Sequence, residues 1–468
     1  MIPFSNSYVN LPAQMFNRQT AKPVADPKLI VANAPLAYNL GIDPDWLSTH
    51  EACEILAGNA VASGSEPIAT AYAGHQFGNW NPGLGDGRAL LLGEVLATDG
   101  IRRDIQLKGS GPTPYSRSGD GRAWLGPVLR EYLVSESMHA MGVPTTRALA
   151  AVTTGETVLR EEPLPGAIIT RVAQSHIRVG TFQLMASRGD IEALSALFEY
   201  AVDRHYPDAD SPSALLEAVV KAQAKLIAKW MSVGFVHGVM NTDNVSIAGE
   251  TIDYGPCAFM DAYDAESVFS AIDQQGRYSY KNQPRIAVWN MAQFATSLIP
   301  LMPNQDAAIK DFTKVINAFQ EHYEAEWIMA FGAKLGLVDP TETDRAVISD
   351  LLVLMQQNSA DFPKTFTTLA DPDTIIQLKD TAAFQAWAVR WQERGYDVKI
   401  MAAANPVIVA RNHQVEAVIA AGCQGNFEPF HALLAAVTKP YAPVTDLNAK
   451  FMRAPEIGER VTQTFCGT

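Results

Sequence analysis

The sequence contains few cysteines and no long apolar run. Its four cysteines, Cys53, Cys257, Cys423 and Cys466, lie far apart and form no C-x-x-C pair. This spacing argues against a structural zinc site and against a disulfide scaffold, so free thiols are the simplest expectation. No window approaches the roughly 20 uninterrupted apolar residues of a membrane helix, and the N-terminal stretch MIPFSNSYVNLPAQMF lacks the regions of a secretory signal. We therefore expect a cytoplasmic protein without a membrane partner.

Positive charge is also scarce. The chain has 36 Lys and Arg against 50 Asp and Glu, which gives a formal net charge of −14. Affinity for a phosphate backbone depends mainly on clustered Lys and Arg, so we expect no nucleic-acid partner. With 468 residues, of which 47% are hydrophobic, the chain is long enough to bury a large core and to divide into two or three substructures.

The first part of the chain has the character of extended structure and short strands. Residues 1–60 mix short apolar stretches with Pro and Asn, as an extended arm that packs on the rest of the protein would. Residues 61–180 are rich in Gly, and the runs at 89–95, 101–107 and 167–172 are β-suited segments bounded by turn residues. This part is therefore predicted to form a sheet.

Helices are predicted to dominate the remainder. The segment 128–141 repeats apolar residues at steps of three and four, and 214–233 and 289–302 do the same farther along. We therefore predict an α+β fold in which a small strand-rich lobe, residues 61–180, precedes a large helical lobe, residues 181–468. Ligands commonly bind in the cleft between two such layers.

A glycine-rich segment, GLGDGR at residues 83–88, leads into a predicted strand. A Rossmann turn would lead into a helix, whose N-terminus receives the pyrophosphate. Glycines between two strands instead suit a hairpin that covers phosphates, because the backbone at Gly85 and Gly87 can approach oxygen atoms closely and Arg88 adds a forked donor. A plain turn is the alternative that three glycines also allow.

A lysine and a helical glutamate follow in the order found in protein kinases. Lys108 ends a predicted apolar strand, and the predicted helix at 128–141 carries Glu131 and Glu136. In kinases a strand lysine after the glycine-rich loop binds phosphates, and a helix glutamate holds its ammonium group. Helical spacing does not choose between Glu131 and Glu136. A lone lysine after a strand is more often a solvated surface charge, so the interpretation depends on the ordered set.

The most specific segment is GFVHGVMNTDN at residues 234–244. It predicts a catalytic loop, followed by a hairpin with its turn at 248–249 and by a metal-binding triplet that begins at Asp253. Kinases place H-R-D-x-x-x-x-N before D-F-G, where the Asn and the second Asp are oxygen ligands for the metal ions. Counting seven residues from His237 reaches Asn244. Asn244 and Asp253 are therefore candidate metal ligands, and an ordinary polar turn is the alternative.

One position departs from the kinase pattern. Two residues after His237, where a kinase keeps its catalytic aspartate, the chain has Val239, which cannot accept a proton. Either the chain is an inactive binding module or the base has moved, in which case Asp243 beside Asn244 is the obvious replacement carboxylate. We interpret His237 as a packed structural residue.

Further cations are expected between the two predicted lobes. They are Arg171, Arg178, Arg117 and Arg122, and the last two flank Asp120-Gly121. Together with Lys108 and Arg88 these arginines could enclose a triphosphate. If the γ end is buried among them, the α-phosphorus faces the solvent, where an acceptor hydroxyl could attack it and pyrophosphate would leave.

Long stretches of the chain resemble the SelO family, called YdiU in bacteria, whose members are pseudokinase-like protein adenylyltransferases. The matching stretches are FSNSYVNLP near the start, AGHQFG at 73–78, LGDGR at 84–88, LKGSGPTPYSRSGDGRA at 107–123, LREYLVSESMHAMGVPTTRAL at 129–149, HGVMNTDN, DYGP, and RNHQVEAVI at 411–419. The resemblance implies a protein-kinase-like two-lobed fold. It also implies transfer of AMP from ATP to Ser, Thr or Tyr hydroxyls of partner proteins.

The resemblance further implies an ATP orientation reversed relative to kinases. The residues that it places around the nucleotide are Gly85, Gly87, Arg88, Lys108, Asp120, Gly121, Arg171, Arg178 and Asp253. It implies Mg²⁺ or Mn²⁺ held by Asn244 and Asp253, Asp243 as general base, and Glu131 as the partner of Lys108. Transfer of UMP from UTP with Mn²⁺ is a variant. The rival functions are a kinase and a catalytically silent nucleotide-binding module.

The resemblance suggests a redox role for two of the cysteines. Family members end with a selenocysteine or cysteine close to the C-terminus, and Cys466 matches the cysteine form. Cys257 follows directly after the segment 253–256. A disulfide between Cys257 and Cys466 that gates activity by oxidation is therefore a hypothesis, and two unrelated thiols are the alternative, since intracellular disulfides are uncommon.

Overall fold

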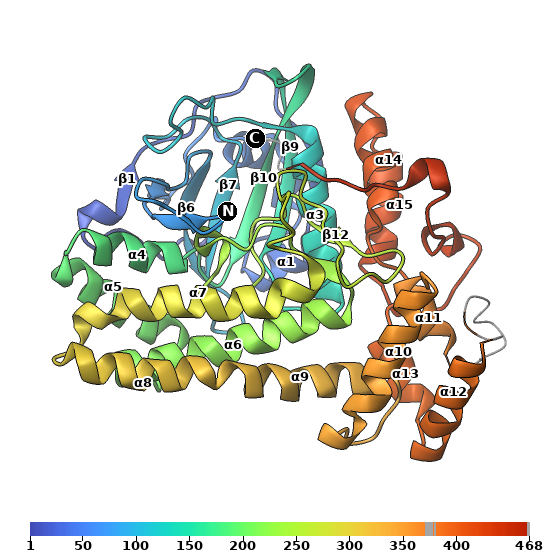
Figure 1. The fold of residues 1–468 in the computed structure, drawn as a ribbon. Coiled ribbons are helices and arrows are strands. Elements are labelled where there is room, and N and C mark those ends of the chain that lie inside the picture. The colour runs from blue at the N-terminus through green and yellow to red at the C-terminus, as the bar shows by residue number, and fades with distance from the viewer. Residues whose placement is uncertain (370–377, 379–380, 466–468) are drawn as a thin grey trace.

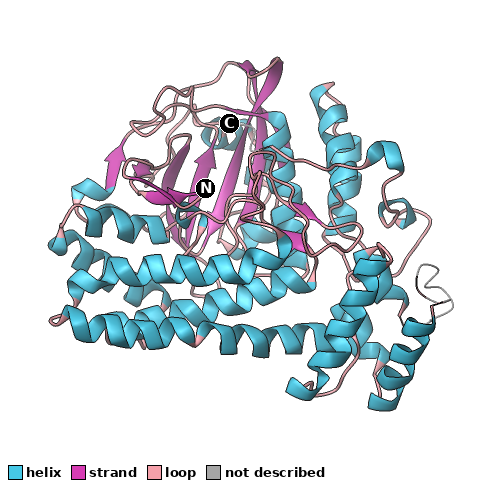
Figure 2. Ribbon diagram, in the orientation of Figure 1, coloured by secondary structure: helices cyan, strands magenta, loops and turns pink. Residues whose placement is uncertain are grey.

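The computed structural model describes residues 1–369, 378 and 381–465 of the chain. The N-terminal part of these residues forms an antiparallel sheet, and the C-terminal part is largely helical (Figure 2). The prediction of a mixed α+β fold is therefore confirmed. None of the described helices is both long enough and apolar enough to span a membrane.

In the described residues the main sheet has eight strands, in the order β1-β3-β6-β7-β10-β9-β2, with β8 paired to β10. The strands are β1 (Phe16–Arg18), β2 (Lys28–Ala32), β3 (Ile68–Thr70), β6 (Ala89–Leu96), β7 (Arg102–Lys108), β8 (Ala123–Trp124), β9 (Arg147–Leu159) and β10 (Pro163–Ala173). Two small sheets accompany it, one of β4 (Gly74–Gln76) with β5 (Asn79–Asn81) and one of β11 (Phe235–Val236) with β12 (Ala258–Phe259). The three predicted β runs coincide with β6, β7 and β10.

The first 60 residues contribute both edges of the main sheet. Strand β1 pairs with β3, where Phe16 faces Thr70, and strand β2 pairs with β9, where Leu29 faces Val152. The N-terminal segment therefore forms part of the sheet and does more than wrap around it. Edge strands are a risk for association between chains, so two short strands are a common way to end a sheet.

The glycine-rich segment does not form the simple hairpin predicted for it. It lies in the long connection between β3 and β6, which pair with each other at Ile68 and Leu91. The small β4–β5 hairpin is inserted in the same connection and pairs only within itself. The loop at 83–88 is thus held at one end by the main sheet and at the other by a separate hairpin.

Helix α3 (Leu125–Ala140) packs against the sheet and is buried on nearly every side (Figure 1). Its contacts include β9 and β10 on one side and α14 (Asn412–Cys423) and α15 (Glu428–Val437) on the other. A helix in this position must be apolar around most of its circumference. The predicted helix at 128–141 is present, but it begins three residues earlier, at Leu125.

The helical region follows β10. Its other helices are α4 (Val179–Ser187), α5 (Ile191–His205), α6 (Pro212–Ser232), α7 (Gln283–Leu298), α8 (Gln305–Asn317), α9 (Phe319–Lys334), α10 (Arg345–Gln357), α11 (Phe362–Thr368), α12 (Ala382–Arg394) and α13 (Val398–Ala404). The short helices α1 (Ala34–Asn39) and α2 (His50–Leu56) lie between β2 and β3 in the chain. Helices α6, α7, α8 and α9 lie alongside one another beneath the sheet (Figure 1). Helix α6 begins at Pro212 because the Ser211 side chain accepts from the Ala214 amide and Pro suits the first turn.

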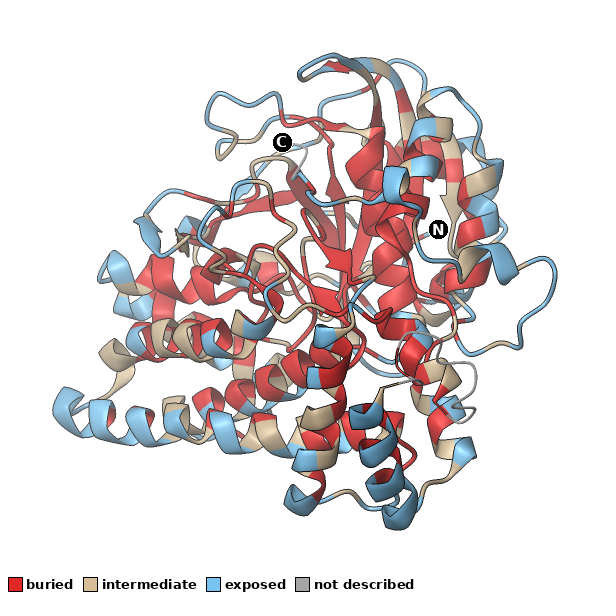
Figure 3. Ribbon diagram, turned by 45° about the vertical axis from the view of Figure 1, so that its right-hand side comes forward, coloured by how far each residue is buried: buried red, intermediate tan, exposed pale blue. Residues whose placement is uncertain are grey.

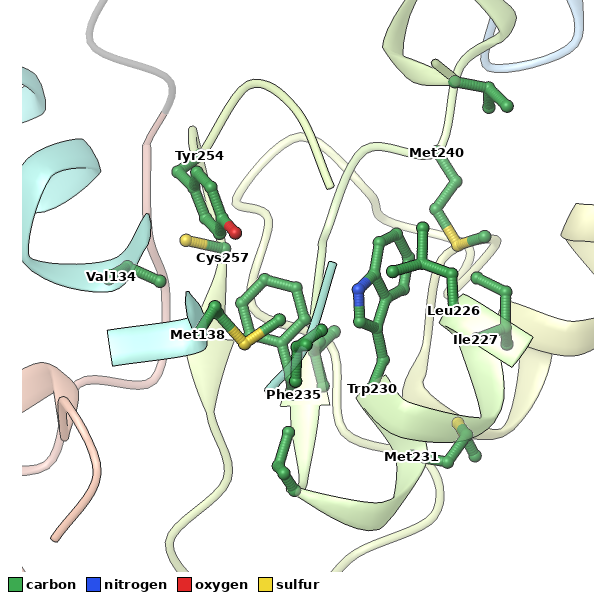
Figure 4. Close-up of a cluster of buried hydrophobic side chains, with 14 of the residues drawn as sticks. Val134, Met138, Leu226, Ile227, Trp230, Met231, Phe235, Met240, Tyr254 and Cys257 are labelled. Atoms are coloured by element: carbon green, nitrogen blue, oxygen red, sulfur yellow. The ribbon is translucent and has the colours of Figure 1, made fainter. Parts of the chain in front are cut away.

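The core joins the sheet to these helices. Burial follows the strands and the inward faces of the helices, whereas exposed residues lie on the outer faces and loops (Figure 3). Figure 4 shows part of this core, where Met138 of α3, Trp230 of α6 and Phe235 of β11 meet beside Tyr254. The loops that carry the predicted site are therefore anchored by buried aromatic side chains on their inner side.

The segment 245–252 differs from its prediction. We expected a hairpin there, but Ser246 forms a bridge with Arg178 and Thr251 forms a bridge with Thr145. The Thr251 amide donates to the Pro144 carbonyl at 2.9 Å. The extended residues were recognised correctly, but their partners come from distant segments, which local pattern does not reveal.

Candidate active site

The predicted site residues surround one cavity of about 620 Å³ between the sheet and the helical region. Fourteen of the candidate residues line it, namely Gly85, Gly87, Arg88, Lys108, Arg117, Asp120, Gly121, Arg122, Glu131, Arg171, Arg178, Asp243, Asn244 and Asp253. This volume lies within the range of ordinary small-molecule sites, about 300–1,000 Å³. The structure thus brings together residues that are up to 168 positions apart, from Gly85 to Asp253.

Lys108 lies at the end of β7 and is paired with helix α3. Its Nζ donates to Glu131 Oε2 at 2.6 Å and to Asp253 Oδ1 at 3.3 Å. Glu136 lies on the other side of α3, where it accepts from Arg147 Nε at 2.8 Å. Of the two glutamates that the sequence left open, Glu131 is therefore the one that contacts Lys108.

Two arginines complete a cluster of cations around Asp253. Arg171, from β10, donates to Asp253 Oδ1 at 2.5 Å, and Arg178, at the start of α4, donates to Oδ2 at 2.5 Å. Both arginine side chains are only 2% exposed. Burial alone would raise the pKa of Asp253, but Arg178, Arg171 and Lys108 hold that pKa well below its ordinary value. Asp253 is therefore an anion that binds three cations.

The backbone at Asp253 is in the left-handed region, with a φ of 63°. Five described residues other than glycine have such a conformation, and three of them, Phe77, Arg117 and Asp253, line the cavity. Sparsely populated conformations of this kind cost about 1–3 kcal/mol each and persist where surrounding contacts determine them. Their concentration here is typical of a functional site.

The predicted catalytic loop includes a short 3₁₀ turn at Thr242–Asn244. Asp243 is largely buried, its Oδ2 accepts from Gln76 Nε2 at 3.2 Å, and its Oδ1 has no hydrogen-bond partner in the described part of the chain. Burial raises the pKa of this carboxyl to about 6, although Arg178 acts to lower it. A carboxyl group with a pKa near neutrality has the property expected of a general base.

Val239 and His237 occupy positions that offer no base. Val239 lines the cavity with an aliphatic side chain. His237 is buried, with its ring stacked on Trp230 at 5.3 Å between centroids and its Nε2 at 2.9 Å from the Ile252 carbonyl oxygen. Asp243 is therefore the carboxylate of this loop that can act as a base.

Asn244 and Asp253 provide oxygen atoms that suit a hard cation. The Asn244 amide nitrogen donates to the Val239 carbonyl at 3.0 Å, and Asn244 lines the cavity together with Asp253. The described residues contain no group of three or more His, Cys, Asp or Glu side chains that could hold a metal ion. Magnesium is commonly bound by one or two protein oxygen ligands together with substrate phosphates, so this small donor set fits such an ion.

The outer end of the cavity is formed by the glycine-rich segment and by the loop that follows β7. At Gly85, where φ is 129°, an added Cβ would lie 2.5 Å from the Tyr115 ring, so this position requires glycine. Asp120 is paired with Arg160 at 2.9 Å, and this hydrogen bond is the main reason why the pKa of Asp120 is lowered. Arg88 is half-buried and also lines the cavity.

Cys257, the one cysteine of the redox hypothesis that the structure describes, does not line the cavity. Cys257 is buried behind the segment 253–256, close to Tyr254 (Figure 4). Cys466 lies outside the described residues, so the hypothesis of a Cys257–Cys466 disulfide stays a prediction. The described end of the tail runs beside the loop after the metal triplet, where Thr464 forms a bridge with Ser270.

Three further residues of the cavity wall had no predicted role. Tyr72 stacks on the Arg178 guanidinium at 4.8 Å, and Asp86 accepts from Thr70 Oγ1 at 2.6 Å. Gln76 is the side chain that donates to Asp243. Gln76 and Asp86 lie in stretches, AGHQFG and LGDGR, that the sequence analysis singled out as segments without giving these residues a function.

Comparison with known proteins gives a consistent result along the chain. A family model described as "Protein adenylyltransferase SelO" matches residues 1–438. A "Protein nucleotidyltransferase YdiU" of Ruegeria pomeroyi is 55% identical over 471 residues, covering 100% of this chain and 99% of the relative. Proteins of the same name from Roseobacter denitrificans and Methylorubrum populi are 56% and 51% identical, with the same coverage.

Proposed function

Because the chain belongs to the protein adenylyltransferase SelO family, we propose that it transfers AMP from ATP to Ser, Thr or Tyr hydroxyls of other proteins and releases pyrophosphate. The observation that carries the proposal is the buried cluster of Lys108, Arg171 and Arg178 at the closed end of the cavity. Such a cluster suits the most highly charged part of a nucleotide, its terminal phosphates.

In the proposed arrangement the γ and β phosphates contact the cation cluster. The protein then has a kinase-like two-lobed fold, with residues 61–180 as the smaller lobe and 181–468 as the larger, but it holds ATP in the reverse direction. The α-phosphorus lies toward the open end, and the glycine-rich segment with Arg88 covers the nucleotide. Lys108 stays oriented by Glu131 at 2.6 Å.

Asn244 and Asp253 would hold Mg²⁺ or Mn²⁺. A divalent ion bound there would neutralise charge that develops on the leaving pyrophosphate. Asp253 contacts three cations already, so phosphate oxygens that bind Lys108, Arg171 and Arg178 would release its carboxylate oxygens for this role. The side chains of the cluster thus need only small changes of partner on ATP binding.

Asp243 is proposed as the group that takes the proton of the acceptor hydroxyl. It stands on the loop beside Asn244, and no other residue of that loop offers a carboxylate. The acceptor oxygen attacks the α-phosphorus, the bond from that phosphorus to the bridging oxygen breaks, and the electron pair leaves with pyrophosphate. The proton passes to Asp243. Val239 takes no part in this step because an aliphatic side chain cannot accept a proton.

Labelled nucleotides test the proposal against its rivals. The purified chain is incubated with Mg²⁺ or Mn²⁺, a heat-treated bacterial protein extract, and ATP labelled at either the α or the γ position. Label on protein from the α position alone is expected. Label from the γ position alone would establish a kinase, and protein without label in either case would establish a silent nucleotide-binding module.

The same assay with α-labelled UTP measures nucleotide choice. If UMP is transferred from UTP with Mn²⁺ as fast as AMP is transferred from ATP, the protein has both activities. A strong preference for ATP would restrict the proposal to AMP.

A further inference from the structure

The β4–β5 hairpin is fastened to the loop that carries Asp243. The His75 amide donates to Thr242 Oγ1 at 2.7 Å, and Gln76 Nε2 donates to Asp243 Oδ2 at 3.2 Å. Thr242 and Asp243 are adjacent on the loop, so neighbouring residues of the hairpin contact neighbouring residues of the catalytic turn. The contact joins segments that are 167 positions apart.

The next residue of the hairpin makes a third contact of the same kind. The Phe77 amide donates to Asn241 Oδ1 at 3.0 Å, and the Tyr278 hydroxyl donates to the same oxygen at 2.7 Å. Phe77 and Gly78 have φ values of 51° and 82°, as the two central residues of a type I′ turn do. The tight turn therefore fixes where the side chain of the preceding residue, Gln76, points.

Close packing on the inner side of the hairpin adds to this fixation. An added Cβ at Gly74 would lie 2.9 Å from Asp243 Oδ1 and 3.1 Å from Thr242 Oγ1. The His75 ring packs against the rings of Trp80 and Trp289, at centroid distances of 5.0 Å and 5.3 Å. The hairpin therefore packs on the Asp243 loop through Gly74 and on two tryptophan rings through His75.

The two oxygens of Asp243 have different surroundings. Oδ1 is buried near Gly74 without a partner in the described residues, whereas Oδ2 accepts from Gln76. A carboxylate oxygen has two acceptor positions, so Oδ2 keeps one for a further donor. Gln76 and Asp243 both line the cavity. Oδ2 can therefore accept a second hydrogen bond from a group in the cavity.

We infer that Gln76 is a positioning residue for the transfer reaction: its side-chain amide fixes the rotation of the Asp243 carboxylate and presents Oδ2 to the acceptor hydroxyl. This inference rests on the proposed function. Without the amide, the carboxylate rotates toward other partners and spends less time in the reactive orientation. The cation cluster that holds ATP lies on other elements, so nucleotide binding is unaffected.

Steady-state kinetics of Gln76→Leu test the inference. Leucine has a similar size but no donor. With α-labelled ATP and a fixed amount of heat-treated bacterial protein extract as acceptor, we expect kcat to fall about tenfold, and KM for ATP to stay within about twofold of wild type. Asn79→Ala is the matched control, because Asn79 faces Gln76 in the hairpin and is exposed. It should leave both constants unchanged.

Two outcomes overturn the inference. One is an unchanged kcat in Gln76→Leu. The other is a fall in kcat accompanied by an equal rise in KM for ATP and a lower melting temperature, which indicates that Gln76 only supports the fold.

Asp243→Asn in the same assay separates this failure from failure of the proposed function. If Asp243→Asn is inactive and Gln76→Leu is not impaired, only the role of Gln76 is wrong. If Asp243→Asn has the wild-type rate, the proposed base is wrong whatever the result for Gln76.

Discussion

The closed end and the open end of the cavity hold their charges in different ways. At the closed end, Arg171 and Arg178 are 2% exposed and both contact Asp253. At the open end, Arg160 and Asp120 are paired, but their side chains are 18% and 47% exposed. A charge in a buried place must have a partner, because water cannot stabilise it, whereas an exposed charge can exchange its partner for water.

This difference suggests separate roles for the two ends: the closed end binds the phosphates, and the open end admits the nucleotide and the protein acceptor. Asp253 holds the side chains of Lys108, Arg171 and Arg178 in place before a nucleotide arrives. In the proposed function the phosphates therefore meet a site that is already arranged. The Arg160–Asp120 pair at the open end contributes little energy and can rearrange when a nucleotide or a protein acceptor enters. Mutations at the two ends should therefore have effects of very different size.

The largest effect is expected for Asp253→Asn. Asparagine tolerates the φ of 63° at this position, so the change removes the charge and spares the backbone. Three buried cations lose their common partner and the candidate metal ligand becomes neutral. We expect transfer of label from α-labelled ATP to fall by about 10³-fold or more, and unfolding to become easier by about 3–5 kcal/mol.

Metal titrations and thermal unfolding provide the controls for Asp253→Asn. Excess Mn²⁺ should not restore the rate, and the melting temperature should drop. A rate within tenfold of wild type would contradict the assignment of the closed end as the phosphate and metal site.

The second effect compares two glutamates of one helix. Glu131→Gln weakens the hold on Lys108, so we expect transfer to fall about 10–100-fold, the value of a hydrogen bond to a charged group. Glu136→Gln affects a structural contact with Arg147 and the Ala148 amide. It should lower the free energy of unfolding by about 1.5–3 kcal/mol and leave the rate per folded molecule unchanged. Equal kinetic effects of the two changes would remove the distinction.

Fixed spacing within a segment let the sequence name residues that the structure brings together in one cavity. Asn244 follows His237 by seven positions, and Asp253 begins a triplet, so both could be identified without coordinates. The choice between Glu131 and Glu136 could not, because it depends on how α3 is rotated against the sheet. That rotation is set by packing with β9, β10, α14 and α15.

Contacts between distant segments explain what the sequence analysis missed. Gln76 acquires its contact with Asp243 only because the β4–β5 hairpin docks on a loop 167 positions later. Residues 1–60 gave no strand signal, yet β1 and β2 form the sheet edges by pairing with β3 and β9. Likewise, the hairpin expected at 245–252 was wrong because Ser246 and Thr251 pair with Arg178 and Thr145. Local periodicity contains no information about such partners.

A smaller effect is expected at the open end. Asp120→Asn removes the carboxylate charge from the partly exposed ion pair with Arg160, and ion pairs near the surface contribute about 0–1 kcal/mol. We therefore expect KM for ATP to change by at most about fivefold, with no change in melting temperature. The measurement is repeated at high salt, where screening should reduce the difference from wild type. A loss as large as that of Asp253→Asn would show that the two ends do not differ.

The smallest effect on transfer, namely none, is expected for a buried lysine far from the cavity. Lys334 ends α9 with its ammonium 4.3 Å from the Phe366 ring centre, and burial lowers its pKa to about 7. Lys108 is also buried, but its Nζ forms an ion pair with Glu131 at 2.6 Å. Lys334→Met should therefore change stability and not the rate.

The lowered pKa of Lys334 determines how the effect of Lys334→Met on stability should vary with pH. In the unfolded chain Lys334 has a pKa of about 10.4, so between about pH 7 and pH 10 the unfolded state binds more protons than the folded state. Stability of the wild type that depends on this group accordingly rises with pH through that range and is lowest below about pH 7. Lys334→Met removes the dependence, so its gain in melting temperature should be largest near pH 7 and should shrink toward pH 10. A gain that is independent of pH would mean that Lys334 is charged in the folded protein and has a partner that stabilises it.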